Sequence, residues 1–173
     1  KEGLLYFAKG AKIKVGVVIF RDYADGEKGL VEVMPLTPSS NMSRLNSFLD
    51  TGGSYGIKSS PSDKTQTEAL YCGMNTALEK LAFNKEESNI LLVVGDCGND
   101  ASDTKYSKET IIKNLVAKNV SLMGFQVQNR NVVAYSSFND QLTDMIRRSL
   151  LGNYKAYDPK IVVRERQTKN GFD

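Results

Sequence analysis

The sequence contains no histidine and only two cysteines among its 173 residues. Without histidine the chain lacks the usual general base, the Ser–His and Cys–His nucleophile pairs and the commonest zinc ligand. Cys72 and Cys97 lie 25 positions apart and fit no Cys-x-x-Cys metal or redox motif. We expect two small buried side chains in preference to a disulfide. Any catalysis would therefore rest on carboxylates, lysines, hydroxyls or a hard metal ion.

The sequence also lacks a long hydrophobic run, because its longest apolar stretches are residues 17–20 and 90–94. A membrane-spanning helix needs about 20 apolar residues, so none is expected. The first five residues do not resemble a signal peptide, and the sequence by itself therefore leaves the compartment open. Hydrophobic residues make up 40% of the chain and charged residues 25%, an ordinary globular balance that excludes disordered and collagen-like classes. This length fits one domain.

The net charge of +3 is distributed unevenly along the chain. Residues 147–173 contain seven basic and three acidic residues, and the preceding part is nearly neutral. These charges are not interleaved with an aromatic platform for stacking bases, so nucleic-acid binding is not expected. We divide the chain into a domain over residues 1–152 and a basic C-terminal extension over residues 153–173.

The order of apolar patterns predicts an α/β domain with a mainly parallel sheet. Nearly continuous apolar segments predict buried strands, and the segment that contains Pro35 predicts an antiparallel edge strand joined by a hairpin turn at residues 22–29. A period of 3.6 residues predicts the helices. The expected strands are residues 13–20, 30–36, 90–94, 120–127 and 161–164, and the expected helices are residues 4–9, 41–49, 65–83, a helix capped by Ser107, and a helix capped by Ser137 and stopped by Gly152.

Polar residues follow two of the predicted strands, where open α/β sheets bind their ligands. Asp96 leaves a buried strand at its carboxyl end, and its carboxylate suits Mg²⁺ or Ca²⁺ as well as it suits capping a turn. Thr65 and Glu68 have the spacing of a capping box, which explains them without a ligand. The alternative is that Thr65 presents its hydroxyl to a cation beside Asp96. The residues alone leave both interpretations open.

Taken together, these parts resemble the von Willebrand factor type A domain over residues 4–151. The resemblance is carried by residues 13–23, 64–70, 91–96, 111–124 and 138–151. It implies a Rossmann-like, doubly wound sheet with a metal-ion-dependent adhesion site at one edge. The resemblance also implies that Thr65 and Asp96 contact Mg²⁺ or Ca²⁺ there, directly or through water.

The sequence departs from this family in one respect that affects both fold and site. It contains neither the Asp-x-Ser-x-Ser motif that supplies the remaining metal contacts nor the strand before it. In the family that strand lies between the strands expected at residues 13–20 and 90–94. Its absence would leave two rows of backbone donors and acceptors unpaired, which stable folds avoid. We therefore expect the domain to be incomplete in this chain, with the strand either preceding residue 1 or supplied by another chain.

A second resemblance is to haloacid-dehalogenase-like phosphatases, which are magnesium-dependent enzymes. Residues 95–100 (GDCGND) match the magnesium loop of that family, and residues 17–26 resemble its nucleophile strand. The nucleophile pattern there is Asp-x-Asp, whereas Asp22 and Asp25 are separated by two residues. An inserted residue would displace a carboxylate that must lie in line with the phosphorus.

We predict a non-enzymatic protein-binding or adhesion module with an incomplete metal-ion-dependent adhesion site. An acidic side chain of the protein partner would fill the open coordination position of the ion. The first alternative is a metal-independent structural subunit of a larger assembly, docked through the basic residues 155–169. The phosphatase is the second alternative. The family resemblance favours an extracytoplasmic or cell-surface location.

Overall fold

The N-terminal part of the fold is an antiparallel hairpin. The computed structural model describes residues 12–50, 67–128 and 130–155. Within them, β1 (Lys14–Phe20) pairs with β2 (Val31–Pro38), and the register shifts once, between Val15 and Val17. The turn between the strands contains a short 3-10 helix, η1 (Tyr23–Asp25), and continues through Gly26 and Gly29, which have φ values of +83° and +94° that favour glycine. The predicted hairpin and its edge strand are confirmed.

A second pair of strands is parallel and forms the other half of the sheet layer. β3 (Asn89–Gly95) pairs with β4 (Val120–Gln126) in an unbroken register. The crossover between them is helix α4 (Lys108–Ala117), which begins after Ser107. The Oγ atom of Ser107 accepts the backbone N–H of Thr110 at 3.2 Å, as the sequence predicts.

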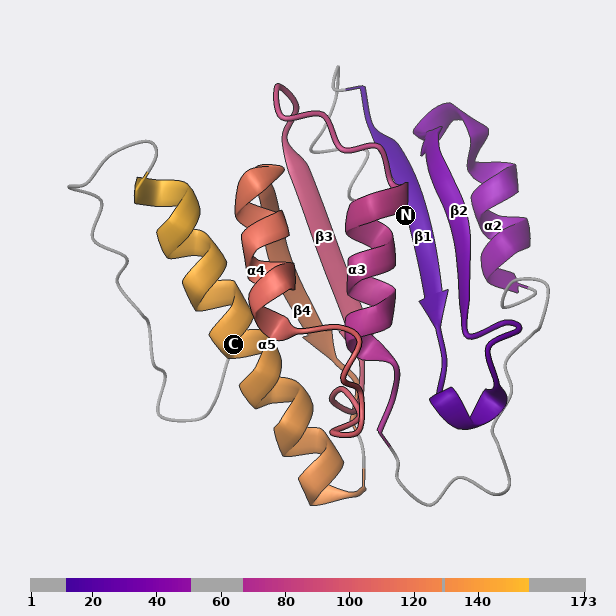
Figure 1. The fold of residues 1–173 in the computed structure, drawn as a ribbon. Coiled ribbons are helices and arrows are strands. Elements are labelled where there is room, and N and C mark those ends of the chain that lie inside the picture. The colour runs from indigo at the N-terminus through magenta and orange to yellow at the C-terminus, as the bar shows by residue number, and fades with distance from the viewer. Residues whose placement is uncertain (1–11, 51–66, 129, 156–173) are drawn as a thin grey trace.

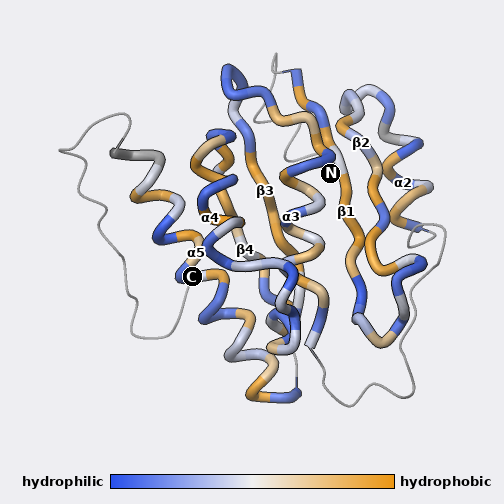
Figure 2. The backbone as a smooth tube through the Cα atoms, in the orientation of Figure 1, coloured by the Kyte–Doolittle hydropathy of each residue, from blue (hydrophilic) through white to orange (hydrophobic). Residues whose placement is uncertain are grey.

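Three helices cover one face of these strands. α3 (Leu70–Lys80) lies over β1 and beside α4, and the long α5 (Val132–Lys155) packs on α4 and β4 (Figure 1). The apolar side chains between the helices and the strands form a single buried cluster, and Figure 2 shows the hydrophobic strands behind α3 and α4. Each fully buried large side chain contributes roughly 2 kcal/mol. The cluster comprises Leu70, Met74, Leu78, Val93, Ile111, Ile112, Leu115, Val120, Leu122, Phe138, Leu142 and Met145.

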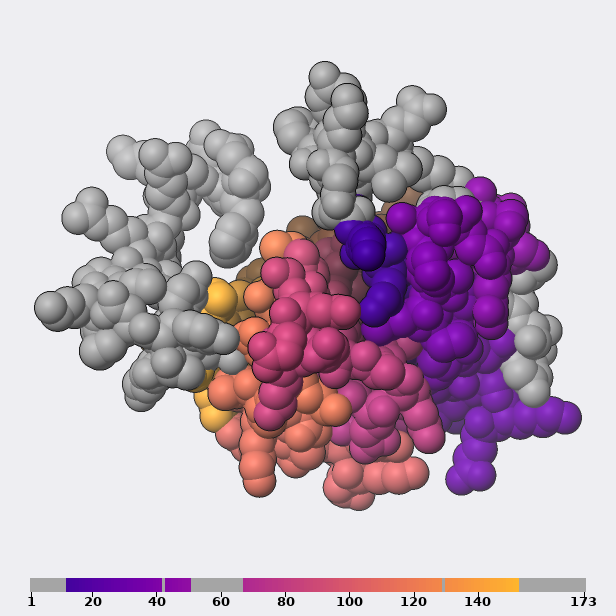
Figure 3. All heavy atoms as spheres, turned by 90° about the horizontal axis from the view of Figure 1, so that it is seen from above, coloured from indigo at the N-terminus to yellow at the C-terminus, as the bar shows by residue number. Residues whose placement is uncertain are grey.

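The remaining helix flanks the hairpin. α2 (Met42–Asp50) follows a short 3-10 helix, η2 (Ser39–Asn41), and contacts β2, with Leu45 buried. In the view from above, the residues of β2 and α2 occupy one side of the molecule and those of α4 and α5 the other, with α3 between them (Figure 3). None of the described helices is long and apolar enough to cross a membrane.

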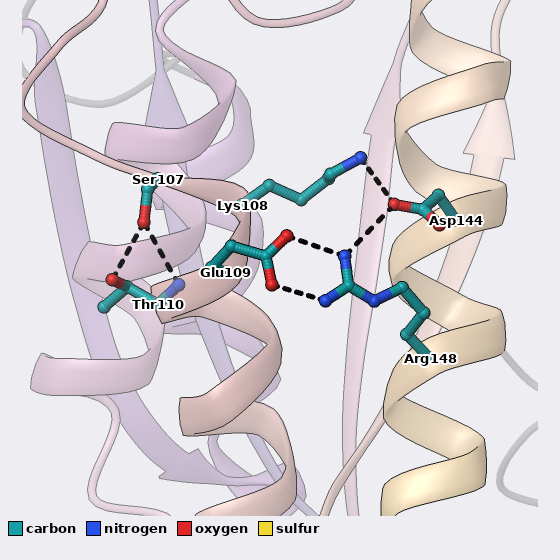
Figure 4. Close-up of polar contacts among 6 residues, drawn as sticks. All are labelled: Ser107, Lys108, Glu109, Thr110, Asp144 and Arg148. Carbon is teal, nitrogen blue, oxygen red and sulfur yellow. Dashed lines mark hydrogen bonds and ion pairs between the residues drawn. The ribbon is translucent and has the colours of Figure 1, made fainter.

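A network of ion pairs joins the first turn of α4 to α5. The guanidinium of Arg148 contacts the carboxylates of Glu109 and Asp144, and Asp144 also pairs with Lys108 (Figure 4). All four side chains are at least one-third exposed, so the network contributes little to stability.

The boundaries of two helices differ from the prediction. α3 begins at Leu70 and α5 at Val132, whereas the sequence predicts starts at Thr65 and Ser137. Gly152 does not stop the last helix, which continues through it to Lys155. A Cβ atom at Gly152 would lie 2.6 Å from Cγ2 of Val116, so this glycine permits the close approach of α5 to α4. The helix expected at residues 4–9, the loop at residues 51–63 and the strand at residues 161–164 lie outside the described residues.

The two strand pairs are not joined by backbone pairing. Among the described residues, β1 pairs only with β2 and β3 only with β4, and no strand lies between β1 and β3. This is the position at which the family resemblance predicts a missing strand. The fold class is confirmed: helices pack on a sheet layer that contains one parallel pair and one antiparallel edge pair.

Candidate functional site

Three segments meet at the carboxyl ends of β1 and β3, and we call this edge the rim. They are the end of β1, the residues just before α3, and the loop at residues 96–103. The N–H of Ala69 donates to the carbonyl of Arg21 at 3.0 Å. On the other side, the N–H of Glu68 donates to the carbonyl of Gly98 at 3.1 Å, and the carbonyl of Glu68 accepts the N–H of Asp100 at 3.0 Å. The backbone at residues 68–69 therefore bridges the two strand ends.

Asn99 fixes the beginning of α3. Its Oδ1 atom accepts the N–H of Tyr71 at 2.7 Å, and its Nδ2 atom donates to the carbonyl of Asp100 at 3.0 Å. The predicted capping box of Thr65 and Glu68 is wrong, because the helix starts later and Glu68 forms a β-bridge with Asn99. The cap lies 28 residues away in the sequence, so no local pattern could reveal it.

The carboxylate of Asp100 is a structural acceptor within the rim. Its Oδ2 atom accepts the hydroxyl of Thr67 at 2.7 Å, and its Oδ1 atom accepts both the hydroxyl and the N–H of Ser102, each at 2.7 Å. The hydrogen bonds from Ser102, followed by that from Thr67, lower the pKa of Asp100 below its usual value. The carboxylate therefore stays charged and holds the loop against the segment before α3.

Asp103 connects the same loop to the hairpin turn. Its Oδ2 atom accepts the hydroxyl of Tyr23 at 2.7 Å, and its Oδ1 atom accepts the N–H groups of Lys105 and Tyr106 at 3.0 and 3.1 Å. Burial, and then the bond to Asp103, raise the pKa of the Tyr23 phenol above its usual value. Tyr23 is consequently a neutral donor, and the loop is bound to two elements by side chains.

Helix α5 supplies the third support of the rim loop. The hydroxyl of Ser137 accepts the N–H of Gly98 at 3.1 Å, and Oε1 of Gln141 accepts the N–H of Asn99 at 2.8 Å. The prediction that Ser137 caps the last helix is wrong. Asn131 provides the cap, because its Oδ1 atom accepts the N–H of Val133 at 3.0 Å. Sequence reasoning therefore missed the role of Ser137, which lies one turn inside the helix and projects to the rim.

Asp96 lies at the rim, at the carboxyl end of β3, where the sequence predicts it. It is half-buried, and one of its carboxylate oxygens accepts the thiol of Cys97 at 3.3 Å. Burial, and then the neighbouring charge of Asp96, raise the pKa of Cys97, so its thiol remains protonated. Cys72 and Cys97 are both buried and free, as expected. Thr65 lies outside the described residues, so its pairing with Asp96 stays a prediction.

The described residues do not by themselves form a metal centre. They contain no group of three or more Asp, Glu, Cys or His side chains able to hold an ion. The carboxylates of Asp100 and Asp103 accept the hydrogen bonds described above, and Asp96, the predicted ligand in this part of the chain, accepts the thiol of Cys97.

The residues that resemble the phosphatase motifs form hydrogen bonds within the fold. Asp22 accepts the N–H of Ala24 at 2.6 Å and caps η1. Asn99 and Asp100, in the segment that matches the magnesium loop, hold α3 and Thr67. These contacts account for the residue types without a phosphate substrate.

An ion pair secures the base of the hairpin turn. Arg21 contacts Glu32 at 2.9 Å and donates to the carbonyl of Gly29 at 2.6 Å. The two charged side chains are only 7% and 11% exposed, so the pair is protected from solvent screening. It fixes the β1–β2 turn beside the rim.

Comparison with known proteins gives one family. A family model described as the TssR protein VWA domain matches residues 4–170. Neither the curated proteins nor the solved structures contain a significant match.

Proposed function

The chain belongs to the family of TssR protein VWA domains, and we propose that it acts as a non-enzymatic protein-binding module that docks its partner at the rim. The resemblance to the von Willebrand factor type A domain is thereby confirmed. The family supports a role in protein interaction, and the rim supplies a prepared surface. The observation that carries the proposal is the apolar start of α5 beside a loop held by hydrogen bonds.

Val132 and Val133 are the most exposed large apolar side chains in the described part, at 74% and 79%. They begin α5 one turn before Ser137, the residue that holds the rim loop. Val127, at 46% exposure, follows β4 and donates its N–H to Gly95 at the end of β3. Protein interfaces commonly have an apolar centre surrounded by polar groups. The valines would form that centre, with the rim loop as the polar border.

The support of the loop by three elements favours binding because little conformational entropy remains to be lost on docking. Asn99 holds α3, Asp103 holds the hairpin turn, and Ser137 holds α5. Exposed residues of the loop, such as Ala101 and Ser102, are therefore presented to a partner in a fixed position.

The experiment is affinity purification of the tagged protein from its native cells, with the co-purifying proteins quantified. Replacing Val132 and Val133 by Asp is expected to deplete a partner that the unchanged protein retains. Lys113→Ala, an exposed change on α4, serves as the control and should retain it. If the double variant is folded and keeps every partner, the rim proposal is wrong.

We propose further that Asp96, with Thr65, contributes to a Mg²⁺ or Ca²⁺ site at the rim. The support is the position of Asp96 and the preference of these ions for carboxylate and hydroxyl oxygens. Two protein ligands would bind weakly, so an acidic side chain of the partner would complete the site. Isothermal titration of Mg²⁺ and Ca²⁺ into the protein and into Asp96→Asn tests this. The absence of heat in the unchanged protein, with normal partner binding by Asp96→Asn, would refute it.

A second candidate function is a metal-independent structural subunit of a larger assembly, in which residues 155–169 dock on a neighbour. The observation that favours it is the row of exposed apolar side chains on β3 and β4, the surface that a permanent neighbour would cover. Retention of the partner in excess chelator supports this candidate, and loss in chelator supports the metal site. For either candidate we propose an extracytoplasmic or cell-surface location.

A further inference from the structure

Two side chains fix the first turn of α5, where Val132 and Val133 are exposed. Oδ1 of Asn131 accepts the N–H of Val133 at 3.0 Å. The side-chain amide of Gln126, the last residue of β4, donates to the carbonyl of Tyr135 at 2.6 Å. The start of the helix is therefore tied to the strand, and the two valines form an apolar anchor that needs little ordering before a partner binds.

Charge is distributed unequally over the described part of the molecule. The turn after β1, the rim and the start of α5 lie at the same end (Figure 1), and we call residues 22–29, 67–69, 96–105 and 130–140 the rim end. These segments contain eight acidic and three basic residues, whereas the other described residues comprise seven acidic and twelve basic ones. The rim end therefore has a surplus of five negative charges, and the remainder has a surplus of five positive charges.

Asp140 borders the apolar anchor on the same helix. It is exposed, and the next residue, Gln141, accepts the backbone N–H of Asn99 in the rim loop at 2.8 Å. Asp140 follows Val133 by seven residues, so the two residues lie on one face of α5, about 10 Å apart along its axis. A partner that covers Val133 and continues along the helix therefore meets a carboxylate.

The rim loop adds a second charged carboxylate beside the anchor. The hydrogen bonds from Ser102, followed by that from Thr67, lower the pKa of Asp100, so this side chain carries its charge at neutral pH. Like charges that face each other across an interface exclude a partner, whereas opposite charges accelerate its association. A divalent ion at Asp96 would offset two of the five surplus charges and leave the rim end negative. A partner surface that is acidic overall is therefore disfavoured.

We propose that the partner docked at the rim is a cationic amphipathic segment of another protein. Its apolar side chains cover Val132 and Val133, and its Lys or Arg side chains face Asp140 and the rim loop. The inference rests on the docking function proposed above and names the chemistry of the partner. An acidic side chain that completes an ion at Asp96 would be a single exception within such a segment. Because the charges are exposed, they govern the choice of partner and the association rate, and their effect weakens in salt.

NMR titration of the protein with two probe peptides tests the proposal. Both peptides have Leu at helical spacing, and their remaining positions are Lys in one and Glu in the other. At low salt the Lys peptide should shift the amide signals of residues 98–103 and 132–140 and bind about tenfold more tightly than the Glu peptide, and at high salt the difference should fall below about threefold. Asp140→Lys should weaken binding of the Lys peptide about threefold or more. Glu86→Lys, the same charge change at an exposed residue outside the rim end, is the matched control and should leave binding unchanged.

Three results would overturn the proposal. Equal binding of the two peptides at the rim end would show that charge does not select the partner there. Tighter binding of the Glu peptide would assign an acidic partner. Equal weakening of the Lys peptide by Asp140→Lys and Glu86→Lys would show that only the total charge matters. The native partner separates these failures from failure of the docking rim: its loss on replacing Val132 and Val133 by Asp, with full retention by Asp140→Lys, would keep the rim and refute the cationic segment.

Discussion

The side chain of Asn99, in the loop after β3, accepts the backbone N–H of Tyr71 in the first turn of α3 at 2.7 Å. A helix N-terminus is thus capped by a residue from a different element, and the same amide group holds the rim loop through Asp100. The rim loop and the core helix α3 are therefore coupled through one side chain.

Asn99→Ala should destabilise the fold, because it removes the cap of α3 and leaves buried backbone groups without a partner. We expect a loss of about 1–3 kcal/mol in the free energy of unfolding, measured in urea. Asn114→Ala, inside α4, is the matched control and should change stability by less than ~0.5 kcal/mol. Equal effects of the two changes would contradict the role assigned to Asn99.

Ser137→Ala should loosen the rim loop without unfolding the protein, because it removes the acceptor for the N–H of Gly98. Exchange of that amide should accelerate about fivefold, the effect of losing a hydrogen bond of ~1 kcal/mol. Exchange of core amides such as that of Leu122 should not change. A uniform acceleration would instead show that Ser137 supports the whole fold.

Breaking the buried ion pair at the hairpin should lower the free energy of unfolding far more than breaking an exposed ion pair. Glu32→Ala leaves Arg21 charged and buried, so we expect the free energy of unfolding to fall by about 3 kcal/mol or more. Glu87→Ala removes an ion pair with Lys14 in which both side chains are nearly half exposed, and should cost less than about 1 kcal/mol. Urea unfolding of the two variants in parallel checks this difference, which similar losses would disprove.

Asp100 should contribute a pH-dependent part of stability. Its pKa in the folded state is lowered, chiefly by the hydrogen bonds from Ser102, so its contribution is present above its unfolded pKa and is lost as pH falls through the folded pKa. Stability of the unchanged protein should therefore fall more steeply below about pH 4 than that of Asp100→Asn. Thermal unfolding between neutral and acidic pH measures both slopes. Identical slopes would mean that Asp100 has no such role.

The sequence predicts the strands well because their apolar runs are local features. Residues 13–20 and 90–94 differ from the observed β1 and β3 by one residue at each end or less. The cap at Ser107 is also predicted, since donor and acceptor lie three residues apart. The order of these parts sufficed to identify the family.

The rim could be predicted only in outline. Asp96 occupies the expected strand end, but the residues that hold the loop make contacts over long sequence separations: Asn99 with Tyr71, and Ser137 with Gly98. Thr65 and Glu68 satisfied a local capping pattern that the tertiary pairing of Glu68 with Asn99 overrode. Such contacts depend on the assembled fold and leave no periodic or short-range signal.

The most direct test of the docking rim is hydrogen exchange on the protein in its native complex, compared with the protein alone. We expect binding to protect the amides of residues 98–103 and 132–135, whereas amides on the exposed face of α4, including that of Lys113, should exchange at an unchanged rate. Protection confined to α4 or α2, with residues 98–103 and 132–135 unaffected, would contradict it.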